Sequence, residues 1–206
     1  MRRYSRRTLR NGAEHGARDA ASIATHMATI LILYATTEGQ TARISERMAQ
    51  ILRARGQDAK TCPVETAEQH IAAAKYDAVI IGASIHYGRH PRRLYSLVRN
   101  NRIMLDRRPN AFFSVSLSAG GPGAKPEAAE RYLDKFLKQV NWRPQQTAKF
   151  AGALQFSKYG AFKRLLMVIF VGLAGGDTDT TRDYEYTDWE AVDQFTDAFA
   201  ARLGQK

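Results

Sequence analysis

The chain of 206 residues has one cysteine, Cys62, and no run of apolar residues longer than seven. A lone cysteine cannot form an internal disulfide, nor supply an iron–sulfur cluster or a cysteine-rich zinc site. A bilayer-spanning helix needs about 20 apolar residues, so the sequence predicts no transmembrane helix. We therefore expect a protein of a reducing, cytosolic setting without a metal site.

Acidic residues are also scarce relative to basic ones. Asp and Glu number 20 against 31 Lys and Arg, which gives a net charge of +11. Residues 1–26 hold six arginines against Glu14 and Asp19, a net +4, so residues 27–206 carry +7. A basic body suits an anionic substrate, anionic lipid or nucleic acid. No helix-turn-helix or aromatic–basic groove pattern is present, so we expect no nucleic-acid partner.

Residues 1–26 differ from everything that follows. They are rich in Arg, Ala, Gly and Ser, and they lack both apolar periodicity and the apolar core of a secretory signal. We expect a disordered basic extension there. The composition is also compatible with a transit peptide, and Met27 stands where a shorter chain would begin. The folded domain is predicted over residues 27–206.

Buried strands and amphipathic helices alternate along residues 27–206. The pattern predicts strands at 29–34, 58–64, 76–84, 111–117 and 149–155. It predicts helices at 42–55, 67–74 and 91–101, one opened by Pro126, and one capped by Asp188. This order indicates an α/β three-layer sandwich around a five-stranded parallel sheet. Ligands bind such sheets at the carboxyl ends of strands, where the strand order reverses.

The first loop at that edge, "ATTEGQT" (35–41), has the features of a phosphate site. A loop that enters a helix offers unpaired N–H groups and the positive end of the helix dipole. Thr36, Thr37 and Thr41 add hydroxyl donors, and Gly39 allows close approach. The loop has no lysine and matches neither the Walker A nor the dinucleotide pattern. It suits a singly esterified phosphate without a metal, although an ordinary turn with a threonine cap remains an alternative.

The loops after the third and fourth predicted strands complete the edge. In "GASIHYGRH" (82–90), Tyr87 is suited to stacking on a planar ring, with half-buried packing as the alternative, and Gly88 permits close backbone approach. His86 is either a plain loop histidine or a proton acceptor. The other loop, "SLSAGGPG" (116–123), is glycine-rich and has no aromatic residue.

Together these loops resemble a flavodoxin-type FMN domain. With "NWRP" (141–144), "AGAL" (151–154) and "GGDTDT…YTDWE" (175–190), the chain resembles the menaquinone-dependent protoporphyrinogen oxidases of bacterial haem synthesis over residues 27–203. The resemblance implies FMN as cofactor and oxidation of protoporphyrinogen IX, with menaquinone or another quinone as acceptor. It implies FMN contacts from Thr36, Thr37, Glu38, Gly39, Gln40, Thr41, Ser84, Ile85, His86, Tyr87, Gly88, Ser116, Leu117, Ser118, Gly120 and Gly121. His86 is the candidate catalytic proton acceptor.

Residues 156–176 interrupt the alternation and are predicted to be an insertion in the fifth strand, with Tyr184–Tyr186 as its resumption. Leu165–Val171 is wholly apolar and follows Lys158, Lys163 and Arg164. A short apolar segment with a basic flank suits an interfacial element. The alternative is a packed helix that covers the sheet.

The charge distribution bears on the choice between an enzyme and an electron carrier. A basic rim of Arg89, Arg92, Lys158, Lys163 and Arg164 suits a dianionic porphyrinogen and an anionic membrane surface. We expect a peripheral protein on the cytoplasmic face of the inner membrane. The alternatives are an NAD(P)H:quinone oxidoreductase of similar fold and an electron-transfer flavodoxin, which the basic charge disfavours.

Overall fold

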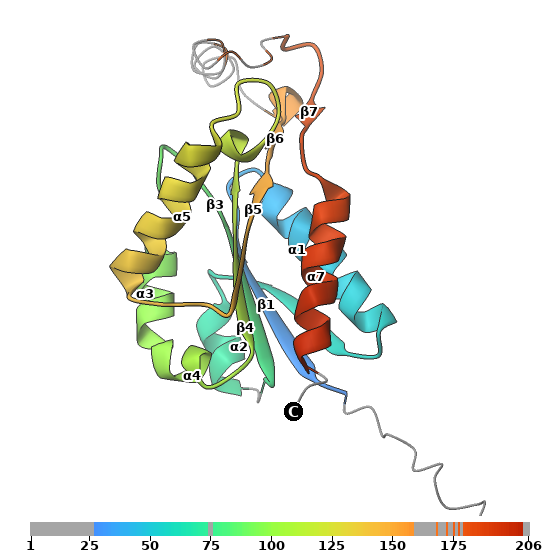
Figure 1. Ribbon diagram of the computed structural model, residues 1–206, viewed down its shortest axis with the longest axis vertical. Helices are drawn as coiled ribbons and strands as arrows, with labels where there is room; N and C mark the ends of the chain where they lie inside the picture. Colours follow the sequence, from blue (N-terminus) through green and yellow to red (C-terminus); the bar gives the residue numbers. More distant parts are fainter. Residues whose placement is uncertain are drawn as a thin grey trace, which may run out of the picture.

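The computed structural model describes residues 27–73, 76–158, 168, 172, 175, 177 and 179–203. Its main sheet has five parallel strands in the order β2-β1-β3-β4-β5 (Figure 1). They are β1 (Thr29–Ala35), β2 (Asp58–Pro63), β3 (Ala78–Ser84), β4 (Asn110–Ser116) and β5 (Gln146–Ala151). The predicted five-stranded parallel sheet is confirmed. The strand order reverses between β1 and β3, which is where this topology binds ligands.

Helices cover both faces of the sheet, as the three-layer prediction requires. On one face lie α1 (Gln40–Ala54) and α7 (Trp189–Leu203), and on the other lie α3 (Arg92–Asn100), α4 (Arg102–Asp106) and α5 (Pro126–Val140) (Figure 1). A short helix, α2 (Ala67–Ala73), joins β2 to β3. The two faces bury separate apolar clusters, one against α1 and α7 and one against α3 and α5.

Local sequence explains the buried face and the end of α1 and the start of α7. Ile44, Met48 and Leu52 recur every fourth residue of α1 and are fully buried against the sheet. Gly56, with φ +78°, follows the helix and turns the chain toward β2. At α7, the carboxylate of Asp188 accepts a hydrogen bond from the backbone N–H of Ala191 at 3.0 Å. The predicted cap at Asp188 is therefore confirmed.

The fifth strand differs from the sequence prediction in its limits. It begins at Gln146, three residues before the predicted start. The prediction missed these residues because they alternate between half-buried and exposed at the sheet edge and form no apolar run. It ends at Ala151. After Gly152, β6 (Ala153–Leu154) pairs antiparallel with β7 (Tyr184–Glu185). The chain thus returns as a two-stranded ribbon, and residues 184–185 do not resume the parallel sheet.

Some sequence predictions fall on residues that the structure does not describe. They include the disordered extension at 1–26 and most of the 156–176 insertion. Within the described residues, no helix is both long and apolar enough to cross a bilayer.

Candidate functional site

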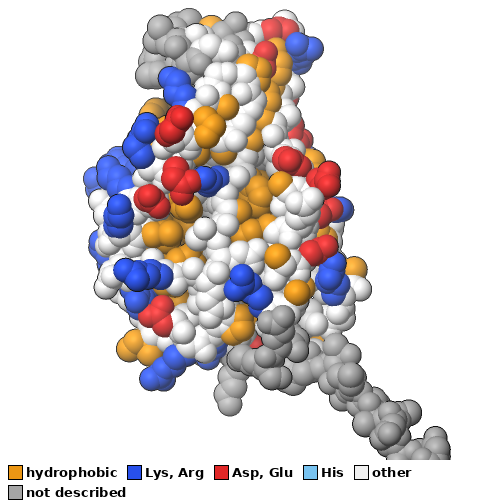
Figure 2. Space-filling model, viewed as in Figure 1, with side chains coloured by type: hydrophobic (Ala, Val, Ile, Leu, Met, Phe, Trp, Pro, Cys, Tyr) orange, Lys and Arg blue, Asp and Glu red, His pale blue; other side chains and the backbone are white. Residues whose placement is uncertain are grey.

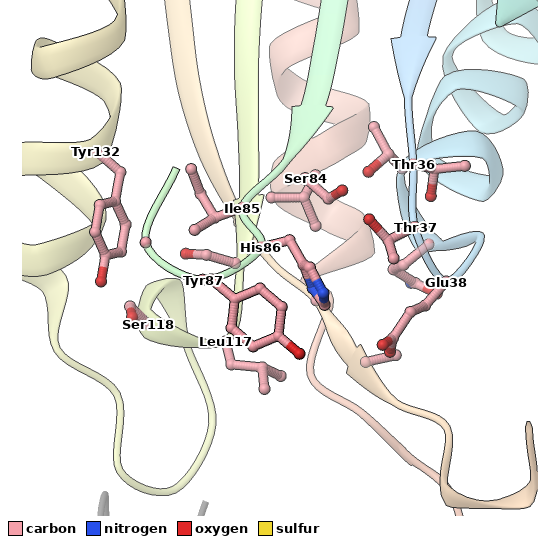
Figure 3. A pocket seen from close by; sticks show the side chains of 17 residues that line it. Thr36, Thr37, Glu38, Ser84, Ile85, His86, Tyr87, Leu117, Ser118 and Tyr132 are labelled. Carbon is pink, nitrogen blue, oxygen red and sulfur yellow. The ribbon is translucent and has the colours of Figure 1, made fainter. Parts of the chain in front are cut away.

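A hollow of about 430 Å³ lies at the carboxyl ends of β1, β3 and β4. The loops predicted to bind a ligand form its walls, and Tyr132 of α5 forms part of one side. In Figure 3, Thr36, Thr37 and Glu38 lie at one end, Tyr132 and Ser118 at the other, and His86 and Tyr87 between them. The lining residues are Thr36, Thr37, Glu38, Gln40, Thr41, Ser84, Ile85, His86, Tyr87, Gly88, Val115, Ser116, Leu117, Ser118, Tyr132, Gly152 and Ala153.

The threonine end of the hollow is built around the start of α1. Gly39 precedes the helix with φ +94°, a conformation that favours glycine, and its N–H donates to Thr36 Oγ1 at 2.9 Å. The first-turn N–H groups that follow have no acceptor within the helix. Thr41 is fully buried, and its Oγ1 has no hydrogen-bond partner among the described residues. A hydroxyl and helix N–H groups therefore converge where an anion would be stabilised.

The middle of the hollow is formed by the loop after β3. The Ile85 N–H donates to the carbonyl of Val115 at 2.8 Å, and the main chains of His86 and Arg89 bond to each other. This small bridge holds Tyr87 at φ +49°, unusual for a residue with a side chain, and leaves it 79% exposed. The rings of Tyr87 and His86 lie 4.1 Å apart, centroid to centroid. Tyr87 thus presents an aromatic surface to whatever enters the hollow.

His90 anchors this loop to the sheet, a role that the sequence pattern did not indicate. Its Nε2 lies 3.0 Å from Ser114 Oγ of β4, and its ring packs against Phe112 and Phe136. Burial lowers the pKa of His90 to about 3, so the imidazole is neutral at physiological pH. A histidine within a polar, basic loop gave no sequence signal for burial.

Only part of the glycine-rich loop after β4 lines the hollow. Leu117 and Ser118 reach the hollow, but Gly120 and Gly121 do not line it. A Cβ on Gly120 would lie 2.9 Å from the Cβ of Ala151, and one on Gly121 would lie 2.7 Å from the ring of Tyr186. These glycines therefore let the loop pack closely against the end of β5 and against Tyr186, the residue after β7.

The structure brings most of the predicted contact residues together around one hollow. Gly39 shapes the turn without lining the hollow. Arg89, which precedes α3, and Arg92, the first residue of α3, are exposed and lie outside the lining. The side chain of Lys158, and all of Lys163 and Arg164, lie outside the described residues. Sequence reasoning missed Tyr132, Val115, Gly152 and Ala153. Tyr132 fits the apolar stripe of its helix, so its pattern indicated core packing.

No group of three or more His, Cys, Asp or Glu side chains within the described ranges is placed to hold a metal ion. The polar atoms of the hollow are mainly hydroxyls and backbone amides, which bind anions and heterocycles.

Comparison with known proteins identifies the family. A family model described as a flavodoxin domain matches residues 31–181. This chain belongs to that flavodoxin family. A curated protein of Escherichia coli (strain K12), named protoporphyrinogen IX dehydrogenase (quinone), is 36% identical over 165 residues, which cover 80% of this chain and 91% of that protein. A protein of the same name from Leishmania major is 36% identical over 83% of this chain and 74% of its own length.

A solved structure supports the fold alone. A point mutant of flavodoxin from Pseudomonas aeruginosa aligns with 85% of this chain and 98% of its own, with a TM-score of 0.50 and 15% identity. The predicted flavodoxin-like architecture is confirmed.

Proposed function

We propose that this flavodoxin-family chain is a quinone-dependent protoporphyrinogen IX dehydrogenase with FMN as its cofactor. The observation that carries the proposal is the 36% identity to the Escherichia coli dehydrogenase across 91% of that protein's length. The match to the family model spans residues 31–181, which include the loops of the site and most of the sheet that holds them.

Features at both ends of the hollow support FMN as its ligand. At the start of α1, the buried Thr41 hydroxyl lacks a partner within the described residues and would donate to a phosphate oxygen together with the first helix N–H groups. Toward Tyr132, the hollow is lined by Tyr87, Leu117 and Ser118, which suit a planar ring with polar edges. The predicted binding set thus divides into a phosphate half and a ring half.

Bound FMN supplies two-electron chemistry, accepting a hydride from a reduced substrate and passing electrons to a quinone. The chain itself has three tasks. The loop of Thr36–Thr41 would hold the phosphate, Tyr87 would stack on the ring, and the backbone of Ser116–Ser118 would contact the ring, since residues of all three segments line the hollow. His86, in contact with Tyr87, is the proposed acceptor for the proton that the substrate releases together with each hydride.

The substrate and the acceptor both suit a basic protein near an anionic membrane. Residues 27–206 carry +7, and Figure 2 shows Lys and Arg side chains along the edge formed by α3 and α5. We propose that Arg89, Arg92, Lys158, Lys163 and Arg164 attract the substrate's propionates and anionic lipid at the cytoplasmic face of the inner membrane. Menaquinone is the proposed acceptor, with other quinones as the alternative.

The test is steady-state porphyrin formation by the FMN-loaded chain under anaerobic conditions. Porphyrin fluorescence should rise above the spontaneous rate with a menaquinone analogue, and replacing it with a ubiquinone analogue ranks the acceptors. Porphyrin formation that is the same with and without quinone contradicts the proposal. A chain that is inert toward the porphyrinogen but reduces quinone with NAD(P)H is an NAD(P)H:quinone oxidoreductase instead.

A further inference from the structure

The first turn of α1 is bound to the return strand β7 by a polar network that lies beside the phosphate half of the hollow. Gln40 Nε2 donates to Glu185 Oε1 at 2.9 Å and to Thr187 Oγ1 at 2.7 Å. Arg43 Nη1 donates to Gln40 Oε1 at 3.1 Å and to Glu185 Oε2 at 2.9 Å. We call these four side chains, Gln40, Arg43, Glu185 and Thr187, the Gln40 clamp.

The clamp uses every hydrogen-bonding group of the Gln40 amide. Both N–H bonds of the amide meet oxygen acceptors, and its oxygen meets a guanidinium, so the amide has one orientation that satisfies all three contacts. Gln40 is 5% exposed and Thr187 9% exposed, so water cannot readily replace either partner. Although Gln40 lines the hollow, its side chain is committed to the clamp and leaves the phosphate to the backbone and to Thr41.

The clamp is also connected to lining residues of the hollow at the ends of β4 and β5. Thr187 Oγ1 donates to the carbonyl of Ala151, the last residue of β5, at 2.8 Å. The next residue, Gly152, donates to the Ser116 carbonyl and accepts from the Tyr186 N–H. Gly152 and Ser116 both line the hollow. One buried hydroxyl therefore joins the start of α1 to the end of β5 and to β7.

Charge within the clamp is balanced. Glu185 would repel a phosphate if it stood alone, but its ion pair with Arg43 offsets this. Burial acts to raise the pKa of the Glu185 carboxyl, yet the hydrogen bonds from Gln40 and Arg43 outweigh burial and hold that pKa below its ordinary value. The carboxylate therefore stays ionised and keeps accepting from both partners. Arg43 also lies over the Trp189 ring, 5.6 Å from its centroid.

We infer that Thr187 and Glu185 are positioning residues, which fix the start of α1 for the FMN phosphate through Gln40 and Arg43. By reciprocity, a phosphate bound at α1 stabilises the return strand β7. The inference rests on the proposed FMN function and adds to it a coupling between the phosphate loop and β7, the strand at Tyr184–Glu185.

The experiment compares FMN with riboflavin, which has the same ring system but no phosphate. Flavin fluorescence quenching on the full-length apoprotein gives a dissociation constant for each. In Thr187→Val, the isosteric change removes the acceptor of one Gln40 amide N–H and the hydroxyl donor to the Ala151 carbonyl, and we expect FMN affinity to fall about tenfold. Riboflavin affinity should stay within about twofold. Thr187→Ser keeps the hydroxyl and should retain the FMN affinity of the unchanged chain.

The matched control is Thr196→Val. Thr196 is fully buried in α7 and its Oγ1 donates to the Val192 carbonyl at 2.7 Å, but it does not line the hollow. This control loses a buried hydroxyl of the same kind and should leave the FMN-to-riboflavin affinity ratio unchanged. A Thr187→Val chain that keeps its FMN affinity, or that loses FMN and riboflavin affinity equally, overturns the inference.

A second measurement needs no variant, so it stands even if Thr187→Val fails to fold. Hydrogen exchange of the Tyr186 amide, which donates to the Gly152 carbonyl at 3.1 Å, should be slowed more by saturating FMN than by saturating riboflavin. Equal protection by the two flavins contradicts the coupling. An unchanged chain that binds no FMN overturns the proposed function and this inference with it, whereas one that binds FMN with equal protection overturns only the inference.

Discussion

Two histidines of the loop after β3 have opposite environments. His86 is half-buried in the hollow against Tyr87, whereas His90 is buried beneath the loop and bonded to Ser114. Only His86 can reach a ligand in the hollow, and only His90 fixes the loop to the sheet. Substitution of His86 should therefore affect catalysis, and substitution of His90 should affect stability.

At His86 we predict an effect on turnover. A positioned proton acceptor contributes about 10²–10⁴-fold to a rate, so His86→Gln should lower kcat by at least about 100-fold. FMN affinity, measured by fluorescence titration, should change little because the proposed contacts of Tyr87 and Leu117 with the flavin ring would remain. An unchanged kcat in His86→Gln would show that another group, or water, accepts the proton.

At His90 we predict a pH-dependent stability. Its pKa is about 3 in the folded chain and about 6.5 when unfolded, so between these values the unfolded state binds a proton that the folded state does not. The contribution of His90 to the free energy of unfolding is therefore fully present above pH 6.5. It is lost by about 1.4 kcal/mol per pH unit as the pH drops toward 3. We would measure the free energy of unfolding by urea between pH 7.5 and 4.5. It should fall less steeply with decreasing pH in His90→Gln, by about 1.4 kcal/mol per pH unit. Parallel pH profiles for the two chains would contradict the burial argument.

At the scale of strands, β3 and β4 fit together through one glycine. Gly82 pairs with Phe113 across the two strands, and a Cβ on Gly82 would lie 2.0 Å from the tip of the Phe113 ring. Gly82→Ala should destabilise the chain by about 1–3 kcal/mol because a fully buried ring must move. The control is Gly152→Ala, whose Cβ would meet its nearest neighbour at 3.6 Å. Equal urea midpoints for the two variants would show that Phe113 shifts without cost.

The elements show which parts of the fold the sequence could reveal. The apolar runs of β1, β3 and β4 and the Asp188 cap are local signals, and they predicted these elements correctly. The edge strand β5 begins with polar residues, so periodicity placed its start three residues late. The pairing of β6 with β7 depends on two residues from each segment, and short ribbons carry no periodic signal.

The residues of the site divide in the same way, into those with a local sequence signal and those without one. Loops after strands are continuous in sequence, so their contribution to the hollow was predictable from their residue types and from sheet topology. Contacts between distant segments were not. Tyr132 reaches the hollow from α5, His90 meets Ser114 across 24 residues, and Gln40 meets Thr187 across 147. Each of these depends on tertiary packing that no local pattern encodes.

At the scale of the whole molecule, charge should govern contact with membranes. We predict that the full chain co-sediments with vesicles containing phosphatidylglycerol but not with neutral phosphatidylcholine vesicles, and that about 1 M salt releases most of it. Reversing Lys163 and Arg164 to Glu should weaken binding more than the equal charge change at Arg107 and Arg108. The latter pair precedes β4 at the end of the sheet opposite the hollow. Equal loss in both variants would indicate binding by overall charge alone.

The central claim is that electrons pass from protoporphyrinogen IX through FMN in this hollow to a quinone. The most direct test is anaerobic stopped-flow mixing of the FMN-loaded chain with protoporphyrinogen IX, while the flavin absorbance is followed. Flavin bleaching by the porphyrinogen alone, and its return with sustained porphyrin fluorescence when a menaquinone analogue is added, is the result we predict. A flavin that stays oxidised in the presence of porphyrinogen would contradict the account.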